Sequence, residues 1–214
     1  MNVLEALTKR TSIRAFLPAN VEPEKLAAVF EAAIRTPSWA NSQPWEVFVA
    51  TGETLERIRK SYAENHANSI QTAPETPRPN AWPDMAIKRR EQLQADMRDN
   101  CGDAAKQFGK LNQVLFNAPA VIYLCMDKVL SEWSLYDIGA YSQSLMLAAT
   151  EHGLGTIPAI TLTVYPDVLH RELQIPENLK ITIGIAIGYP DTNNAINNFI
   201  SARTPLEQYV RIFK

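Results

Sequence analysis

The spacing of hydrophobic side chains divides the chain into helical stretches and short apolar runs. From Pro23 to Arg35, apolar positions recur every three or four residues, which predicts a helix that Pro37 ends. Val121–Met126 is almost wholly apolar and Thr182–Gly188 alternates with glycine, so both predict strands buried in a covered sheet. The other expected elements are helices at 2–9, 54–63 and 136–151, the last ended by Gly153 and Gly155, and a strand at 45–50.

Proline density sets residues 71–84 apart from the rest of the chain. Four prolines exclude a helix or a central strand there and predict a long loop, either a lid over a substrate or a disordered segment. A polar helical stretch follows at 85–113, with breaks expected around Gly102 and Gly109. Because helices and strands are mixed without regular β-α-β alternation, we expect one α+β domain spanning 1–214, with helices flanking a mostly antiparallel sheet.

Composition narrows the possible function classes. With 214 residues, 46% of them hydrophobic and 21% charged, the chain has the balance of a soluble globular protein. Its net charge of -2 provides no electrostatic attraction to nucleic acid or anionic lipid, so neither is an expected partner. No apolar run approaches the ~20 residues needed to cross a bilayer, and Met1–Glu5 has no signal-peptide pattern, so a cytoplasmic protein is expected. The tail from Asp191 to Lys214 is expected to be polar.

Several common active-site chemistries have no matching motif. The three histidines stand alone and the two cysteines do not form a CxxC pair, so no metal site is expected. Cys125 lies in an apolar run and is expected to be a buried core residue. Gly153-Leu154-Gly155 follows a helix instead of a strand, and position 158 is proline, which excludes a dinucleotide-binding fingerprint.

Two arginines and two hydroxyl groups are crowded into Arg10-Thr11-Ser12-Ile13-Arg14. A guanidinium group can donate two hydrogen bonds to one phosphate, and hydroxyl groups add short ones, so the segment favours binding of a small anion. The alternative is a solvated helix end that carries ordinary surface charges.

Residues 37–45 form a second unusual segment, in which two tryptophans and two amide side chains stand between and beside prolines. Amides can recognise the edge of a flat heterocycle because each both donates and accepts hydrogen bonds, and tryptophan supplies an apolar wall. The alternative is a rigid connection whose tryptophans fill the core.

Taken together, these segments resemble the nitroreductase family of FMN-dependent oxidoreductases. The resemblance covers nearly the whole chain and follows the order of the family's motifs. It rests on residues 10–16, residues 37–45, the helix and turn Asp137–Pro158, and Ile187-Gly188-Tyr189-Pro190 with the downstream Arg203.

The resemblance implies a set of residues around FMN. The cluster at residues 10–14, together with Arg203, would hold the phosphate and ribityl chain. The loop at residues 37–41 would reach the flavin from a partner subunit. A backbone N–H group of residues 158–160 would donate a hydrogen bond to flavin N5. These residues are, in that order, Arg10, Thr11, Ser12, Arg14 and Arg203; Pro37, Ser38, Trp39, Ala40 and Asn41; Pro158, Ala159 and Ile160. The chain departs from some members at Ser201, where they have a second basic residue.

The resemblance also implies an intertwined homodimer of nitroreductase-like fold with a flavin at the subunit interface. The helix at 136–151, rich in small residues, would then form the dimer core, although a helix buried within one domain fits its sequence equally well. NADH or NADPH would donate electrons and a small aromatic acceptor would take them in ping-pong order, with no side chain acting as catalytic acid or base. Residues 71–112 would form a variable lid that shapes the acceptor pocket.

The implied activity is reduction of nitroaromatic or similar flat acceptors. Members of the same fold could instead reduce quinones, activated alkenes or carbon–halogen bonds. A third possibility, from another functional class, is a flavin-free dimer that binds a ligand without redox chemistry.

Overall fold

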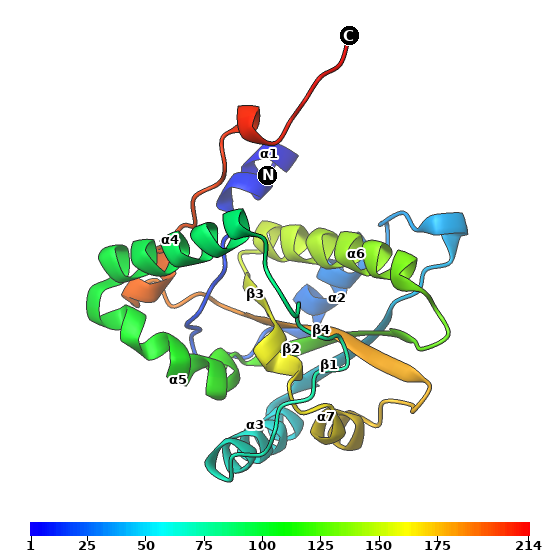
Figure 1. Cartoon of the computed structure of the whole chain (residues 1–214). Coiled ribbons are helices and arrows are strands. Elements are labelled where there is room, and N and C mark those ends of the chain that lie inside the picture. Colours follow the sequence, from blue (N-terminus) through cyan, green and yellow to red (C-terminus); the bar gives the residue numbers. More distant parts are fainter.

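Four strands form one antiparallel sheet at the centre of the molecule. The computed structural model describes all 214 residues (Figure 1). The strands lie in the order β1 (Glu46–Thr51), β2 (Ala120–Asp127), β4 (Leu179–Gly188) and β3 (Gly155–Ala159), and every neighbouring pair is antiparallel. The predicted α+β class with an antiparallel sheet is therefore confirmed. The two strands with the strongest apolar runs, β2 and β4, occupy the interior positions, as expected for strands covered on both faces.

Strand β2 supplies both hydrophobic cores because its side chains alternate between the two faces of the sheet. Val121, Tyr123 and Cys125 pack in one core. The alternate residues Ile122, Leu124 and Met126 pack in the other. All six side chains are fully buried, so a shift of one residue in the pairing would reverse every one of them.

Helices cover both faces of this sheet (Figure 1). On one face lie α2 (Pro23–Ala33) and the long α6 (Glu132–Glu151), which pack against each other and on the second core. On the opposite face lie α3 (Gly52–Ala67), α7 (Pro166–Leu173) and α5 (Phe108–Gln113). Helix α1 (Val3–Lys9) contacts α6, and α4 (Asp84–Cys101) lies beside the C-terminal segment.

The structure confirms most of the predicted elements and corrects three local expectations. Gly155 does not end a helix: it begins β3, where a Cβ atom would lie 2.5 Å from Cγ1 of Ile13. Gly109 lies inside α5, whereas the expected break at Gly102 is present, with a positive φ of 51°. The sequence pattern also missed β3 and α7 altogether, because both are short and Pro158 stands within the strand.

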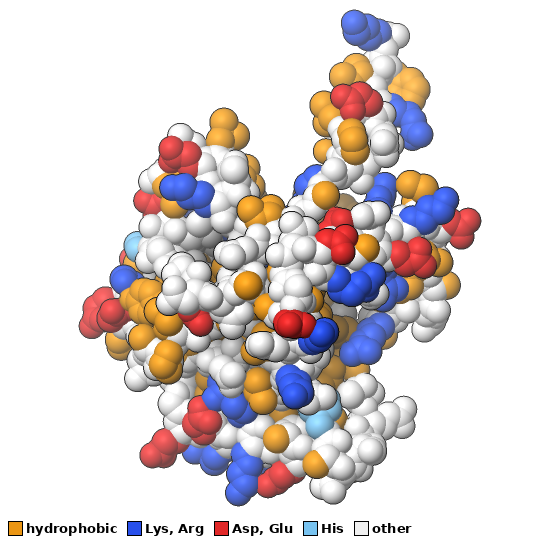
Figure 2. All heavy atoms as spheres, turned by 90° about the vertical axis from the view of Figure 1, so that its left-hand side faces the viewer, with side chains coloured by type: hydrophobic (Ala, Val, Ile, Leu, Met, Phe, Trp, Pro, Cys, Tyr) orange, Lys and Arg blue, Asp and Glu red, His pale blue; other side chains and the backbone are white.

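The C-terminal tail is less polar than expected. Leu206, Tyr209, Val210, Ile212 and Phe213 are all exposed, Phe213 to 90%. The last residues extend away from the globular body (Figure 1), and Figure 2 shows hydrophobic and charged groups interleaved along this projection. The tail thus leaves several large hydrophobic side chains in contact with solvent. No helix in the molecule is both long and apolar enough to cross a membrane.

Candidate functional site

The segment after α1 is fixed on both sides. Ser12 forms a parallel bridge with Thr156 of β3, and the backbone N–H of Ile13 donates to the carbonyl oxygen of Thr156 at 2.9 Å. From the other side, Oδ1 of Asn197 accepts the backbone N–H groups of Arg14 at 2.7 Å and Ala15 at 3.2 Å. Residues 12–15 are therefore clamped between the edge strand and the C-terminal segment.

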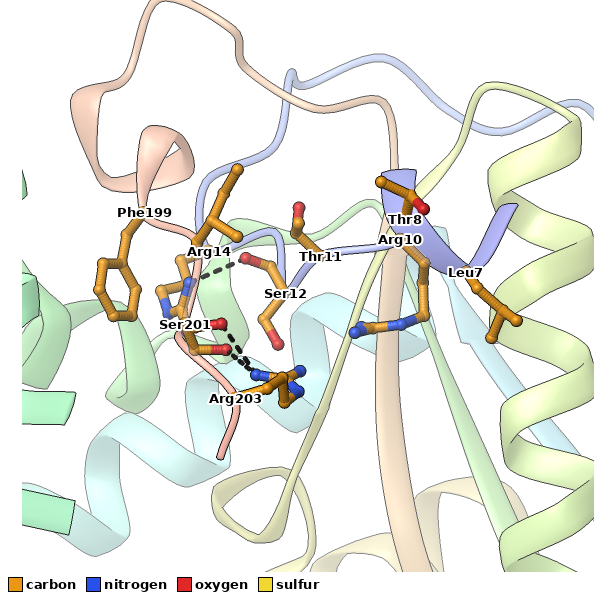
Figure 3. A pocket seen from close by; sticks show the side chains of 10 residues that line it. Leu7, Thr8, Arg10, Thr11, Ser12, Arg14, Phe199, Ser201 and Arg203 are labelled. Carbon is orange, nitrogen blue, oxygen red and sulfur yellow. Dashed lines mark hydrogen bonds between the residues drawn. The ribbon is translucent and has the colours of Figure 1, made fainter. Parts of the chain in front are cut away.

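This clamp brings both ends of the chain around one small cavity of about 190 Å³. Figure 3 shows the side chains of Arg10 and Arg203 pointing toward each other, with the side chain of Ser12 beside that of Arg203. The hydroxyl group of Thr11 points the other way, so Thr11 contributes to the rim without facing Arg203. The lining residues are Leu7, Thr8, Arg10, Thr11, Ser12, Arg14, Phe199, Ile200, Ser201 and Arg203.

The cavity concentrates positive charge without a counterion. None of Arg10, Arg14 and Arg203 forms an ion pair with a carboxylate. Burial, together with the neighbouring charge of Arg203, lowers the pKa of Arg10 from its usual value. Because arginine still stays protonated in proteins, these groups repel one another until an anion neutralises them.

Arg14 is the most enclosed of the three arginines, with 8% of its surface exposed. One guanidinium nitrogen donates to the carbonyl oxygen of Ser12 at 2.9 Å, whereas Nε is buried without a partner. The rings of Phe108 and Phe199 lie 5.8 and 5.4 Å from the guanidinium carbon and hold the group in place. Burial lowers the pKa of Arg14 from its usual value, because removing the charged guanidinium group from water costs free energy.

The segment Pro158–Ile160 lies next to this cavity along the edge of the sheet. Thr156, which bonds the N-terminal segment, precedes Pro158 by only two residues, roughly 7 Å along a strand. Among the strands of the sheet, β3 pairs only with β4; on its other side Thr156 bridges to the N-terminal segment, and residues 158–160 are half-buried. The structure therefore brings together two of the three predicted groups of site residues.

The third predicted group, residues 37–41, lies elsewhere in the same chain. Trp39–Asn41 forms a tight 3₁₀ turn with positive φ at Ala40 and Asn41, and the backbone N–H of Trp39 donates to Oδ2 of Asp137 at 3.2 Å. Asp137 stands near the start of α6, whereas Thr150, near its end, lines a cavity shared with Arg10. Thirteen residues of α-helix separate these positions, about 20 Å.

The side chain of Trp39 is 68% exposed, which contradicts the alternative that this tryptophan fills the core. Trp45 differs: it stacks on Tyr141 of α6 with ring centres 4.7 Å apart. Pro37 and Ser38 precede the turn, and Oγ of Ser38 accepts the backbone N–H of Gln43 at 2.9 Å. The loop is thus rigid and presents an aromatic surface outward.

The sequence does not reveal two residues that support Arg14. Asn197 fixes the backbone at Arg14, and Phe199 packs on its guanidinium group. Ser201, which stands where some family members have a basic residue, accepts a hydrogen bond from Arg203 at 2.7 Å. No local pattern marks Asn197 or Phe199, because each acts through a contact with a distant or folded-back part of the chain.

The Pro-rich segment is tied to the body at Glu75. Oε2 of Glu75 accepts the backbone N–H of Ile181 at 2.7 Å and lies 3.2 Å from Nε2 of His170. Its other oxygen lies 3.7 Å from Nζ of Lys128, and the backbone N–H of Ala73 donates to the carbonyl oxygen of Val164 at 3.0 Å. The Pro-rich segment 71–84, called the strap below, is therefore ordered at Ala73 and Glu75.

No side chain outside the cavity presents an obvious nucleophile or metal site. Burial raises the pKa of Cys125 to about 12, so its thiol stays protonated at neutral pH, in agreement with the predicted core role. No group of three or more His, Cys, Asp or Glu side chains is placed to hold a metal ion.

Comparisons with known proteins agree with this geometry. The family model described as "Nitroreductase family" matches residues 7–189. The chain is 32% identical to nitroreductase NfnB of Mycolicibacterium smegmatis over 94% of this chain and 88% of that protein. It is 29% identical to 4-nitrobenzoate reductase of Pseudomonas putida over 94% and 89%, respectively. The crystal structure of the FMN and NADPH-dependent nitroreductase NfnB from Sphigopyxis sp. strain HMH superposes with a TM-score of 0.93 at 28% identity, covering 100% of both chains.

The contacts of Glu75 predict how removal of its side chain affects local opening of the strap. Replacing Glu75 with alanine removes three polar contacts from a half-buried carboxylate, so the amide of Ala73 should exchange about ten- to a hundredfold faster with deuterium. Hydrogen exchange with mass spectrometry measures this. Glu64→Ala, which removes an exposed carboxylate on α3, is the control. Unchanged exchange at Ala73 in the Glu75 variant would show that the tether does not hold the strap.

Proposed function

The chain belongs to the nitroreductase family, and from this premise we propose that it is an FMN-dependent oxidoreductase that uses NADH or NADPH to reduce nitroaromatic compounds or similar flat acceptors. The observation that carries the proposal is the cavity in which Arg10, Arg14 and Arg203 converge without a counterion. FMN ends in a phosphate dianion, which is the charge that this cavity lacks.

The residues present fit that phosphate. Arg10 and Arg203 face each other from two segments of the chain, and the hydroxyl group of Ser12 lies beside Arg203 (Figure 3). The buried, unpartnered Nε of Arg14 adds a donor that remains unsatisfied in the protein alone. Charge-assisted hydrogen bonds from these groups would offset both the repulsion among the arginines and the burial of Arg14.

The edge of β3 is the place for the flavin ring. The strand runs from Thr156, which bridges to Ser12 in the wall of the cavity, toward Pro158, Ala159 and Ile160, which are half-buried and lie beyond that bridge. A backbone N–H from this stretch would hydrogen-bond at flavin N5. FMN, when bound, supplies the two-electron redox chemistry, and the chain binds it, orients its ring and limits the access of water.

A second copy of the chain completes the site. The turn at 37–41 contacts Asp137, about 20 Å along α6 from Thr150, which lines a cavity with Arg10, so the exposed Trp39 would meet the flavin of a partner subunit. Helix α6 keeps one stripe uncovered, at Trp133, Tyr136 and Gly139, although its small residues favoured close packing on all sides. This uncovered stripe and the projecting tail support a homodimer.

The strap and the helices after it, residues 71–112, would form the wall of the acceptor pocket. The strap is anchored at Glu75 and then leads into α4, which lies beside the C-terminal segment that carries Arg203 (Figure 1). Because the chemistry belongs to the flavin, this wall would select the acceptor by shape and charge.

The proposed function makes a spectroscopic prediction. The purified protein should be yellow, and anaerobic NADPH or NADH should bleach its flavin absorption, which a nitroarene should then restore. A protein that stays colourless after incubation with FMN would instead support the flavin-free alternative. Yellow protein that neither donor bleaches would contradict the nicotinamide half of the proposal.

The phosphate site predicts the effect of removing Arg203. Arg203→Ala should weaken FMN binding by about ten- to a hundredfold, the usual effect of losing a hydrogen bond to a charged group. Fluorescence titration of the FMN-free protein measures the dissociation constant. Arg35→Ala, which removes an exposed arginine outside the described cavities, should leave that constant unaltered. Equal affinities for the Arg203 variant and the wild type would place the phosphate elsewhere.

The homodimer depends on the tail in this proposal. Changing Ile212 and Phe213 together to asparagine should raise the dimer dissociation constant about a hundredfold or more, because each large apolar side chain contributes roughly 1.5–3 kcal/mol on burial. Analytical ultracentrifugation measures the constant, and Arg211→Ala with Lys214→Ala controls for changes to tail charge. An unaffected dimer would show that the tail packs on its own subunit or on nothing.

A further inference from the structure

The end of β3 directs one backbone N–H group toward the open edge of the sheet. The carbonyl oxygen of Thr156 accepts a hydrogen bond from the N-terminal segment, and successive residues of a strand alternate in direction. The carbonyl oxygen of Ala159, which is extended and pairs with β4, therefore faces β4. Because a trans peptide directs its N–H opposite to its C=O, the N–H of Ile160 faces the open edge, whereas Pro158 has no N–H to offer.

Ile160 begins a 3₁₀ turn that is fixed from the core. The turn spans Ile160–Thr163, and the first N–H group of such a turn has no acceptor within it, so the N–H of Ile160 is free to bond a ligand. Oη of Tyr62, which is fully buried on α3, donates to the carbonyl oxygen of Leu162 at 2.7 Å. Oγ1 of Thr163 donates to the carbonyl oxygen of Ile160 at 3.0 Å.

A third hydrogen bond ties the turn to α5. Oγ1 of Thr161 donates to Oδ1 of Asn112 at 2.9 Å. The amide of Asn112 is itself oriented, because its Nδ2 donates to the carbonyl oxygen of Phe108 at 2.7 Å. Thr161 and Asn112 are both half-buried. Since Thr161 follows Ile160 directly, the bond limits rotation of the backbone that carries the free N–H group.

Helix α5 also reaches the phosphate end of the proposed flavin site. Its first residue, Phe108, has its ring centre 5.8 Å from the guanidinium carbon of Arg14. Phe108 and Asn112 are four residues apart, about 6 Å along the helix. Nε of Arg59 on α3 donates to the carbonyl oxygen of Val114 at 3.1 Å, which fixes the other end of α5. One short, anchored helix therefore contacts both the phosphate-binding arginine and the turn after β3.

The same helix borders a second, larger cavity. This cavity has a volume of about 820 Å³ and lies between α4 and residues 102–108. Phe108 and Arg14 line it, and Arg14 also lines the small cavity that holds Arg10 and Arg203. A substitution in α5 can therefore affect a neighbouring ligand as well as the turn. A test of the turn has to measure the flavin itself.

We propose that Asn112 and Thr161 are positioning residues that set the reduction potential of the flavin by holding the N–H of Ile160 toward N5. In oxidised flavin, N5 has a lone pair that accepts a hydrogen bond, whereas N5 of the two-electron-reduced ring carries a hydrogen atom. A fixed donor at this position therefore favours the oxidised cofactor and lowers its potential, and a loosened donor raises it. This inference rests on the proposed function, because only a bound flavin supplies the acceptor.

The test measures the midpoint potential of bound FMN in Thr161→Val and Asn112→Leu, which remove the two partners of one hydrogen bond with little change in volume. Each variant should weaken binding of oxidised relative to reduced FMN about three- to tenfold, which raises the two-electron potential by about 15–30 mV. The double variant should show the same shift as either single variant, because both break the same bond.

Two controls separate positioning from general stability. Thr161→Ser keeps the hydroxyl donor and should retain the wild-type potential. Thr54→Val removes a hydroxyl group that accepts a hydrogen bond from Arg57 on α3, and it should retain the potential as well. A purely structural role would lower Tm and weaken both oxidation states of FMN equally, with no change in potential.

Contrary results distinguish this inference from the proposed function. A yellow protein that NADH or NADPH bleaches, but whose potential neither single variant raises, leaves the proposed function intact and overturns the inference. Shifts that add in the double variant, or a shift in Thr161→Ser as large as in Thr161→Val, would also overturn it. A protein that stays colourless with FMN would contradict both.

Discussion

The organisation of the site depends on holding like charges together. Arg10 and Arg203 repel each other, Arg14 lines the same cavity, and none of the three forms an ion pair with a carboxylate. They stay in place because the backbone around them is fixed independently, by β3 on one side and by Asn197 on the other. Packing elsewhere in the fold offsets the free energy needed to hold these charges together. The result is a preformed binding site for an anion. An enzyme that binds FMN without covalent attachment needs such a place.

The same arrangement explains why the sheet has its order. Strand β3 must lie at the edge so that the N-terminal segment can pair with its start and leave the backbone after Thr156 accessible. The interior strands β2 and β4 need only be apolar, whereas β3 combines a close approach at Gly155 with Pro158, which lacks an N–H group. The edge strand is shaped by the site as much as by the core.

The sequence predicts the elements whose stability is local and misses those that depend on distant contacts. The helix at 23–33 and strand β2 follow from hydrophobic spacing, and the arginine cluster follows from its unusual composition. Strand β3 has no such pattern, because it is short and its geometry depends on Ile13. Asn197 is equally invisible, since it acts through hydrogen bonds to residues more than 180 positions away. The cavity between α4 and residues 102–108 cannot be predicted for a similar reason. The sequence of the polar helix does not show which of its side chains face the opposite wall.

Arg14 lies between two spaces and belongs to both. A negative charge that enters either space screens the same guanidinium group and leaves less attraction for an anion in the other. Two anions bound in these cavities would be coupled through Arg14, and each would weaken the binding of the other by the same factor. An anionic ligand in the larger cavity would thus leave more readily while the phosphate of FMN occupies the cavity of Arg10, Arg14 and Arg203.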